Sequence, residues 1–271
     1  MIKQAIIPLA GLGTRLLPLT SVFAKELLPI NGKPGIEYIL DECIEAGIKE
    51  IIFIISKKKL MIKKYFYNDR FYKDIIKRKK DPHIINEYKK ILRYKKMIKF
   101  VFQDKPLGTG DAVLKTKKLI KNKYFLMLLP DDLIIKNNCS KSMIAIHKKF
   151  NTSVMASMKV SKNNVSRWGI YNIKKKIDNM NFIIKNVVEK PTIKKAPSNN
   201  AVIGRYILPK TIFSKLLNLK PSNGGEIHIT DAIQLLINDN NKFVGHTFTG
   251  KYLDCGTMKG YINSTLEIAK K

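Results

Sequence analysis

Residues able to bind phosphate groups lie close together near the start of the chain, in a glycine-rich segment. Gly11 and Gly13 lack a Cβ atom, so the backbone can turn sharply there and bring its N–H groups close to an anion. Thr14 adds a hydroxyl group, and Arg15 adds a guanidinium that can bind a phosphate through two hydrogen bonds. The apolar run at residues 5–9 comes directly before, which predicts a buried strand leading into a phosphate-binding loop.

A second cation, Lys25, lies ten residues beyond Arg15 and is interpreted as another phosphate clamp. The segment differs from two common nucleotide-binding motifs. Leu16 stands where a dinucleotide-binding fingerprint has its third glycine, and the Gly-Lys-Ser/Thr ending of a P-loop is absent. The alternative is a tight turn after a strand with no ligand, but the Thr-Arg pair and the later lysine favour phosphate binding.

Polar side chains also follow two further predicted strands. Gln103 ends the strand predicted at residues 99–102, and Asp131 follows the strand predicted at residues 124–129, as a metal-binding aspartate would. Ligands of open α/β sheets gather beyond the carboxyl ends of the strands, so both residues are expected beside the glycine-rich loop. A surface amide with no ligand is the alternative interpretation of Gln103.

The elements that must position these residues predict an α/β fold. Apolar spacing predicts a helix at residues 36–44 and a strand at 51–55, which form a βαβ unit with the first strand. We therefore expect a Rossmann-like, mostly parallel, doubly wound sheet. The strand-like segments at 152–160, 169–173 and 182–188 predict an antiparallel extension of the sheet that forms one side of the cleft. We expect one domain over residues 1–271 that ends in a helical region, whose last helix, at 259–270, could serve assembly.

Basic residues dominate the composition, and the formal net charge is +30. Such a charge alone favours a partner that is a nucleic acid or a membrane surface. Almost all of the basic residues are Lys and they are spread along the chain, which favours a charged solvated surface instead. The most basic segment, at about 57–96, predicts a helical insertion broken near Asp81 and Pro82. An RNA-binding arm is its alternative interpretation.

Targeting and redox signals are weak. No apolar run is long enough to span a bilayer, and the N-terminus enters a strand without the pattern of a signal peptide. Three cysteines, Cys43, Cys139 and Cys255, are far apart and suggest neither a disulfide framework nor a zinc site. The expected location is the cytoplasm, with neither a membrane nor a nucleic acid as partner.

Several later segments, taken with the loop, carry a resemblance to a known family. They are Val188-Glu189-Lys190-Pro191, the segment at 196–206, the segment at 224–232, and Tyr252-Leu253-Asp254-Cys255-Gly256-Thr257. With these the chain resembles the nucleotidyltransferases that join a sugar 1-phosphate to a nucleoside triphosphate, above all the bacterial glucose-1-phosphate uridylyltransferases. The resemblance covers nearly the whole chain and is weakest at 57–96.

The resemblance implies transfer of a uridylyl group from UTP to glucose 1-phosphate, with Mg²⁺ as cofactor and release of pyrophosphate. It implies that Arg15, Lys25 and Lys190 are catalytic, and that Asp131 and Asp254 hold the metal. The implied nucleotide-binding residues are Ala10, Gly11, Gly13, Thr14, Gln103 and Gly108. The resemblance also implies that the antiparallel extension forms the sugar side of the cleft, with Gly169, Glu189, Lys190 and Gly204 as the sugar-phosphate-binding residues. The alternative for Glu189 and Lys190 is a surface ion pair. A homodimer or homotetramer is expected.

Some positions depart from the family pattern. The family commonly has Pro at the position of Ala24, Lys at Ser21, His at Asp111 and Gln at His228, and frequently Tyr at Trp168. Asp111 lies close to the loop expected to bind the base, so the choice of nucleotide is open. A thymidylyl or adenylyl relative would share the loop and both aspartates. A non-catalytic nucleic-acid binder would need neither aspartate.

Overall fold

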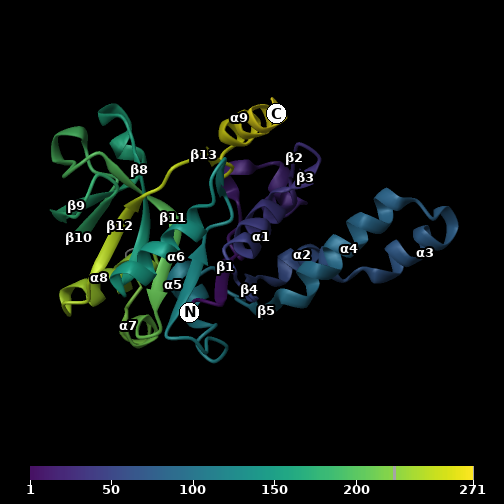
Figure 1. Ribbon diagram of the computed structural model, residues 1–271, viewed down its shortest axis with the longest axis horizontal. Coiled ribbons are helices and arrows are strands. Elements are labelled where there is room, and N and C mark those ends of the chain that lie inside the picture. The colour runs from purple at the N-terminus through teal and green to yellow at the C-terminus, as the bar shows by residue number, and fades with distance from the viewer. Residues whose placement is uncertain (222–223, 271) are drawn as a thin grey trace.

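The computed structural model describes residues 1–221 and 224–270, and a nine-stranded sheet runs through its centre (Figure 1). The strand order is β5-β4-β1-β6-β11-β8-β12-β10-β9. These strands are β1 (Gln4–Pro8), β4 (Glu50–Ile55), β5 (Ile98–Phe102), β6 (Tyr124–Leu128), β8 (Ser153–Lys159), β9 (Gly169–Lys176), β10 (Asn181–Glu189), β11 (Asn200–Pro209) and β12 (Phe243–Thr247).

The N-terminal part of the sheet is parallel. Strand β1 pairs in parallel with β4 and β6, and β4 pairs in parallel with β5. Alternate side chains of β1 enter different cores, with Ala5 and Ile7 in one and Ile6 in the other. A parallel strand covered on both faces reads as a continuous apolar run, which is the pattern that predicted β1 and β4.

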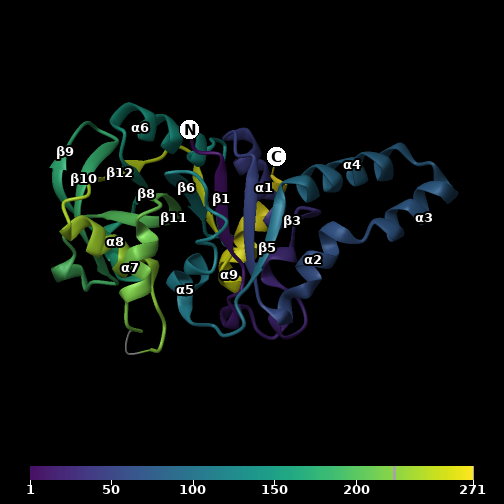
Figure 2. The same cartoon turned by 90° about the horizontal axis from the view of Figure 1, so that it is seen from below.

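Helices cover both faces of the sheet. On one face, α1 (Gly35–Glu45) and α6 (Cys139–Phe150) contribute to the first core, and on the other α5 (Gly108–Leu114), α7 (Ile212–Asn218) and α8 (Ile229–Asn238) contribute to the second. Figure 2 shows α6 on one side of the strands and α5 and α7 on the opposite side. The predicted doubly wound α/β fold is therefore confirmed.

The antiparallel extension is also present. Strand β11 runs antiparallel to β6 and β8, and β10 runs antiparallel to β9 and β12. Strands β11 and β12, the second of which pairs in parallel with β8, were not predicted. The C-terminal helices are thus interrupted by strands. A ribbon of β7 (Asp132–Ile135) and β13 (Lys251–Asp254) and a hairpin of β2 (Pro29–Ile30) and β3 (Lys33–Pro34) complete the strands.

The basic insertion forms a helical arm, made of α2 (Leu60–Tyr67), α3 (Asp69–Lys79) and α4 (Pro82–Met97). Figures 1 and 2 both show α3 and the adjoining part of α4 extending away from the sheet. The predicted break is present, since the Asp81 side chain caps α4 by accepting a hydrogen bond from the backbone N–H of His83. Lys90, at 2.5 Å from the buried carboxylate of Glu37, ties α4 to α1.

The last helix, α9 (Met258–Ala269), lies beside β2, and the Tyr261 hydroxyl donates a hydrogen bond to the carbonyl of Pro29. Within the described residues no helix is long and apolar enough to cross a membrane. The pairing of β6 with β11 joins the parallel and antiparallel parts into one sheet. The interpretation of residues 1–271 as a single domain remains a proposal.

Candidate active site

The loop after β1 has the sharp turn expected from its glycines. Gly13 has φ +69°, a conformation that side-chain-bearing residues rarely adopt, and a Cβ there would lie 3.1 Å from the Thr20 side chain. The Thr20 hydroxyl donates to the Gly13 carbonyl at 2.8 Å. Leu16 is fully buried and anchors the loop in the core, whereas the Arg15 side chain is 69% exposed. The loop is thus fixed to the core while its cation faces solvent.

A cleft of about 450 Å³ opens beyond the carboxyl ends of β1, β5 and β6. Lys25 and Asp131 line this cleft. So do all six residues predicted to bind the nucleotide: Ala10, Gly11, Gly13, Thr14, Gln103 and Gly108. The sequence argument that these strand ends meet at one edge of the sheet is confirmed.

Lys25 and Asp131 form the electrostatic centre of this cleft. The Lys25 Nζ lies 2.7 Å from Asp131 Oδ2, and the Arg15 Nη2 lies 4.0 Å from the same oxygen. Burial alone would lower the pKa of Lys25, but the charges of Asp131 and Glu26 outweigh it and raise that pKa. Burial would likewise raise the pKa of Asp131, yet the Lys25 charge and hydrogen bond lower it. Both groups are therefore charged at neutral pH.

Asp254 approaches the same place from the C-terminal part of the chain. A Cβ atom on Gly256 would lie 2.8 Å from Asp131 Oδ2, 3.3 Å from Asp254 Oδ1 and 3.4 Å from Arg15 Nη2. The side chains of Asp131, Asp254 and Arg15 therefore surround the space that a side chain at residue 256 would occupy, and Gly256 leaves this space free. The approach is fixed by the backbone, since the N–H of Cys255 donates to the Asp131 carbonyl at 2.8 Å.

The donor set fits a magnesium ion. Mg²⁺ prefers one or two carboxylates, with phosphate oxygens and water completing its coordination. Asp131 and Asp254 supply two carboxylates around the same point. No group of three or more His, Cys, Asp or Glu side chains that could hold a metal occurs in residues 1–221 and 224–270, so a ligand would have to supply further oxygens.

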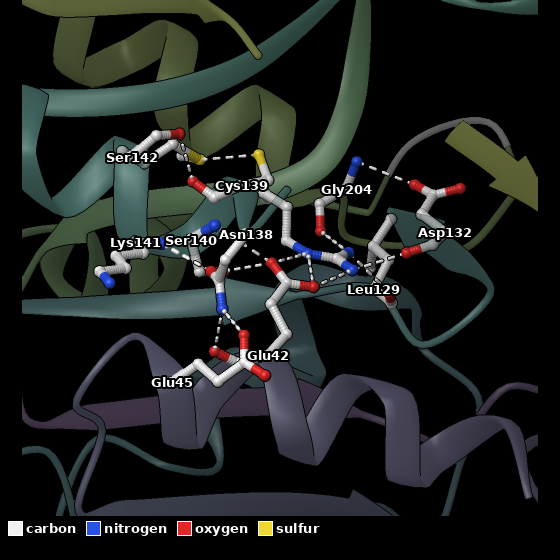
Figure 3. A network of polar contacts seen from close by, with 12 residues as sticks. Glu42, Glu45, Leu129, Asp132, Asn138, Cys139, Ser140, Lys141, Ser142 and Gly204 are labelled. Atoms are coloured by element: carbon white, nitrogen blue, oxygen red, sulfur yellow. Dashed lines mark hydrogen bonds and ion pairs between the residues drawn. The ribbon is translucent and has the colours of Figure 1, made fainter. Parts of the chain in front are cut away.

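A buried ion pair holds the turn that carries Asp131, and it was not predicted. The guanidinium of Arg205, on β11, binds both carboxylate oxygens of Glu42, on α1, at 2.8–3.1 Å. It also donates to the carbonyls of Leu129 and Asp132, at 3.1 and 2.6 Å. Figure 3 shows Glu42 on one side of this network and Leu129, Asp132 and Gly204 on the other. Arg205 thus binds backbone carbonyl groups on both sides of Asp131 in the sequence.

Asp132 is held beside Asp131 by two donors. Its Oδ2 accepts from the N–H of Gly204 at 2.8 Å and its Oδ1 accepts from the Tyr252 hydroxyl at 2.7 Å. Burial and the neighbouring charge of Asp131 raise the pKa of Asp132. A Cβ on Gly204 would lie 2.5 Å from Asp132 Oδ2, so this glycine is required for the close approach of β11 to Asp132. Its predicted contact with the sugar stays a prediction.

Gly169, Glu189 and Lys190 form a second group on β9 and at the end of β10. Gly169 pairs with Glu189, and a Cβ on Gly169 would lie 3.0 Å from the Glu189 Oε2. Lys190 adopts φ +42°, and its Nζ is 4.0 Å from Glu189 Oε1, with both side chains about two-thirds exposed. In the described part of the chain, Lys190 makes no ion pair with the cluster around Asp131. The positions of Glu189 and Lys190 therefore fit a surface ion pair as well as a sugar-phosphate-binding site.

Gln103 and Gly108 line the same cleft and contact each other. The Gln103 amide nitrogen donates to the Gly108 carbonyl at 3.1 Å and to the Asp111 carboxylate at 2.8 Å. Gly108 has φ +90°, and a Cβ there would lie 2.6 Å from the Ile227 carbonyl. The close approach that Gly108 permits is thus with the segment before α8, and its contact with a base stays a prediction.

Sequence reasoning missed the partners in these networks. Arg205 is the only charged residue of β11, and Glu42 lies among buried positions of α1, so each was detectable as a charge within an apolar pattern. Their pairing was not detectable because they lie 163 positions apart. The same is true of the bond from Gln103 to Asp111, because spacing does not show which atoms of two polar side chains meet.

Comparisons with known proteins give consistent results. A profile described as nucleotidyl transferase matches residues 4–271. A UTP–glucose-1-phosphate uridylyltransferase 2 of Streptococcus pyogenes is 34% identical over 275 residues, which cover 100% of this chain and 91% of that protein. A solved UDP-glucose pyrophosphorylase complexed with UDP-glucose has a TM-score of 0.87 and 34% identity, covering 100% of this chain and 99% of that one. A UTP-bound UGPase from Acinetobacter baumannii has a TM-score of 0.90 and 33% identity, covering 99% and 93%.

Proposed function

This chain belongs to the nucleotidyl transferase family, and from that premise we propose that it transfers a uridylyl group from UTP to glucose 1-phosphate, giving UDP-glucose and pyrophosphate. The relatives that are about one-third identical over nearly the full length are named for this activity or for its product, and one of the similar structures contains UTP. The observation that carries the proposal is the convergence of Arg15, Asp131 and Asp254 on the point left free by Gly256.

The reaction joins two anions. A phosphate oxygen of glucose 1-phosphate attacks the α-phosphorus of UTP, the bond from that phosphorus to the bridging oxygen breaks, and pyrophosphate leaves. Catalysis of such a step depends on aligning the two phosphates and offsetting their charge. Lys25 and Arg15 supply cations beside Asp131, and backbone N–H groups of the loop around Gly13 would bind the triphosphate.

The remaining residues are assigned by their position in the cleft. The loop residues Ala10, Gly11, Gly13 and Thr14 would bind the triphosphate. Gln103 and Gly108 would contact the uracil. A sugar-phosphate subsite would be formed by residues of β9, β10 and β11 and the turn after β10: Gly169, Glu189, Lys190 and Gly204.

Asp131 and Asp254 would hold Mg²⁺, with phosphate oxygens completing the coordination. The bound cation would offset the charge that develops on the reacting and leaving phosphates. Lys25 would then lie within reach of the same phosphates, because its Nζ is 2.7 Å from Asp131 Oδ2. Arg205 has no direct part in this scheme, but it positions the backbone on either side of Asp131.

We also propose a cytoplasmic homodimer or homotetramer. The free thiols of Cys43, Cys139 and Cys255 fit a reducing compartment. Ile262 and Leu266, one turn apart on α9, are 49% and 57% exposed and would be covered in an assembly. Light scattering coupled to size-exclusion chromatography measures the oligomeric state, and Ile262→Ser would weaken an assembly formed through α9.

The test of the proposed function is pyrophosphate release from a panel of nucleoside triphosphates, each with glucose 1-phosphate and Mg²⁺. We expect release with UTP, and no release when glucose 1-phosphate is omitted. Release with dTTP or ATP in place of UTP would identify a related nucleotidyltransferase instead. Galactose 1-phosphate and glucose 6-phosphate serve as matched controls for the choice of sugar phosphate.

A further inference from the structure

The side-chain amide of Gln103 has one end engaged by the protein and one end free. Gln103 is only 4% exposed, yet it lines the cleft. Its Nε2 donates to Asp111 Oδ2 at 2.8 Å and to the Gly108 carbonyl at 3.1 Å, so both hydrogens of the NH₂ group are used. Within the described residues the oxygen Oε1 accepts no hydrogen bond. The oxygen is thus the atom available to a ligand.

Asp111 makes the reverse orientation of this amide unfavourable. An ionised carboxylate can only accept hydrogen bonds, and the Gly108 carbonyl can only accept as well. Turning the amide over would place Oε1 against both acceptors and leave them unsatisfied in a buried site. Asp111 is 6% exposed, and its other oxygen lies 3.4 Å from the ammonium of Lys115, so both carboxylate oxygens face hydrogen-bond donors. The orientation is therefore fixed by chemistry, although the two ends of an amide have nearly the same shape.

We infer that Asp111 is a positioning residue that sets nucleotide specificity by turning the oxygen of Gln103 toward the nucleobase. A base that presents an N–H group at this point is accepted, as uracil does with N3–H. Cytosine carries a lone pair at N3 instead, which would face the lone pairs of Oε1. The inference rests on the proposed function, because it takes the base to lie against Gln103. It assigns the rejection of CTP to a residue that does not touch the base.

Uracil and thymine present the same N3–H donor between two carbonyl groups, so Asp111 cannot distinguish UTP from dTTP. A change at Asp111 should therefore alter the preference for UTP over CTP and leave the preference for UTP over dTTP unaltered. Damage to the cleft in general would alter all three substrates together.

The experiment compares kcat/KM for UTP, CTP and dTTP in the parent and in Asp111→Asn, whose amide can either accept from Gln103 or donate to it. The ratio of kcat/KM for UTP to that for CTP should fall by up to about tenfold in the variant. The Asn amide can donate to Oε1 of a turned Gln103, so only the Gly108 carbonyl still opposes the turned orientation. The ratio of UTP to dTTP should stay unchanged. Asp104→Asn is the matched control, since this exposed carboxylate follows Gln103 directly, and it should alter neither ratio.

A double-mutant cycle separates positioning from a structural role. Gln103→Met keeps the length of the side chain and removes both polar atoms, so Asp111→Asn should have no further effect on the ratio of UTP to CTP in that background. The inference is overturned if Asp111→Asn leaves the ratio unchanged, or if its effect persists without Gln103. Calorimetry measures the ratio of the affinities for UTP and CTP, which tests the same preference without turnover. Absence of turnover in the parent would thus reject the proposed function, while the binding ratio would still decide the role of Asp111.

Discussion

The ion pair between Glu42 and Arg205 should stabilise the fold and also hold Asp131 in place, and Glu42→Gln tests both. Arg205 is fully buried, and Glu42 is 7% exposed and binds the guanidinium with both oxygens. The change preserves the shape of residue 42 but removes its charge. The Arg205 cation would then be buried with carbonyl groups as its remaining partners.

Two magnitudes follow from this geometry. Removing one partner of a buried ion pair costs about 3 to 5 kcal/mol, and because Gln can still accept one hydrogen bond we expect a loss of about 3 kcal/mol in the free energy of unfolding. Arg205 also binds the carbonyls of Leu129 and Asp132, so a shift of the guanidinium moves the turn between them. Misplacing a reacting group by about 1 Å can cost about 100-fold in rate, so kcat should fall by more than the loss of folded protein explains.

Urea denaturation followed by the fluorescence of Trp168, the single tryptophan, measures the stability of each variant. Glu45→Gln is the matched control, because Glu45 lies one turn further along α1 and its carboxylate accepts a hydrogen bond from Asn138 at 3.1 Å on the surface. It should cost less than about 0.5 kcal/mol. The reasoning is refuted if Glu42→Gln costs no more than Glu45→Gln, or if kcat is unchanged when the protein is fully folded.

Further predictions concern the exposed cations. Arg15→Ala should mainly raise the KM for UTP, and Lys190→Ala should mainly raise the KM for glucose 1-phosphate, because Arg15 lies beside Asp131 and Lys190 beside Glu189. Initial rates with each substrate varied in turn measure both KM values. Equal effects of one variant on both substrates would contradict the assignment. Gln in place of four exposed lysines of the arm should leave saturating turnover unchanged, because charges beyond about 8 Å are screened at physiological ionic strength. RNA binding by the parent at low salt that is lost in this variant would instead identify an RNA-binding arm. The four positions are Lys77, Lys79, Lys80 and Lys89.

Local patterns were enough to predict the parallel part of the sheet and one side of the cleft. The apolar run before Gly11 predicted β1, and Gln103 and Asp131 were placed correctly because each follows an apolar strand. The edge at which they meet follows from the topology of a parallel sheet. Their roles with substrate remain predictions.

Local patterns could not predict contacts between distant segments. Only the family resemblance placed Asp254 beside Asp131. The two residues meet because β13 pairs with β7, in a ribbon separate from the main sheet, and neither short strand has a distinctive pattern. Strand β12 was missed for a similar reason, since Gly245 and His246 interrupt its apolar residues. The missing side chain of Gly204 makes room for Asp132, which lies 72 positions away, and its expected contact with a sugar stays a prediction. For Asp254 and Gly204, a residue far away in the sequence determines the contact.

The central claim is that Asp131 and Asp254 act together at the point beside Gly256, and turnover of Asp131→Asn and Asp254→Asn tests it most directly. Pyrophosphate release from UTP and glucose 1-phosphate is measured at saturating Mg²⁺, with Asp104→Asn as the control for loss of a carboxylate. Each of the two variants should keep the fold and lose about 100-fold or more in kcat, equivalent to about 3 kcal/mol of transition-state stabilisation. Turnover close to that of the parent in either variant would contradict the account.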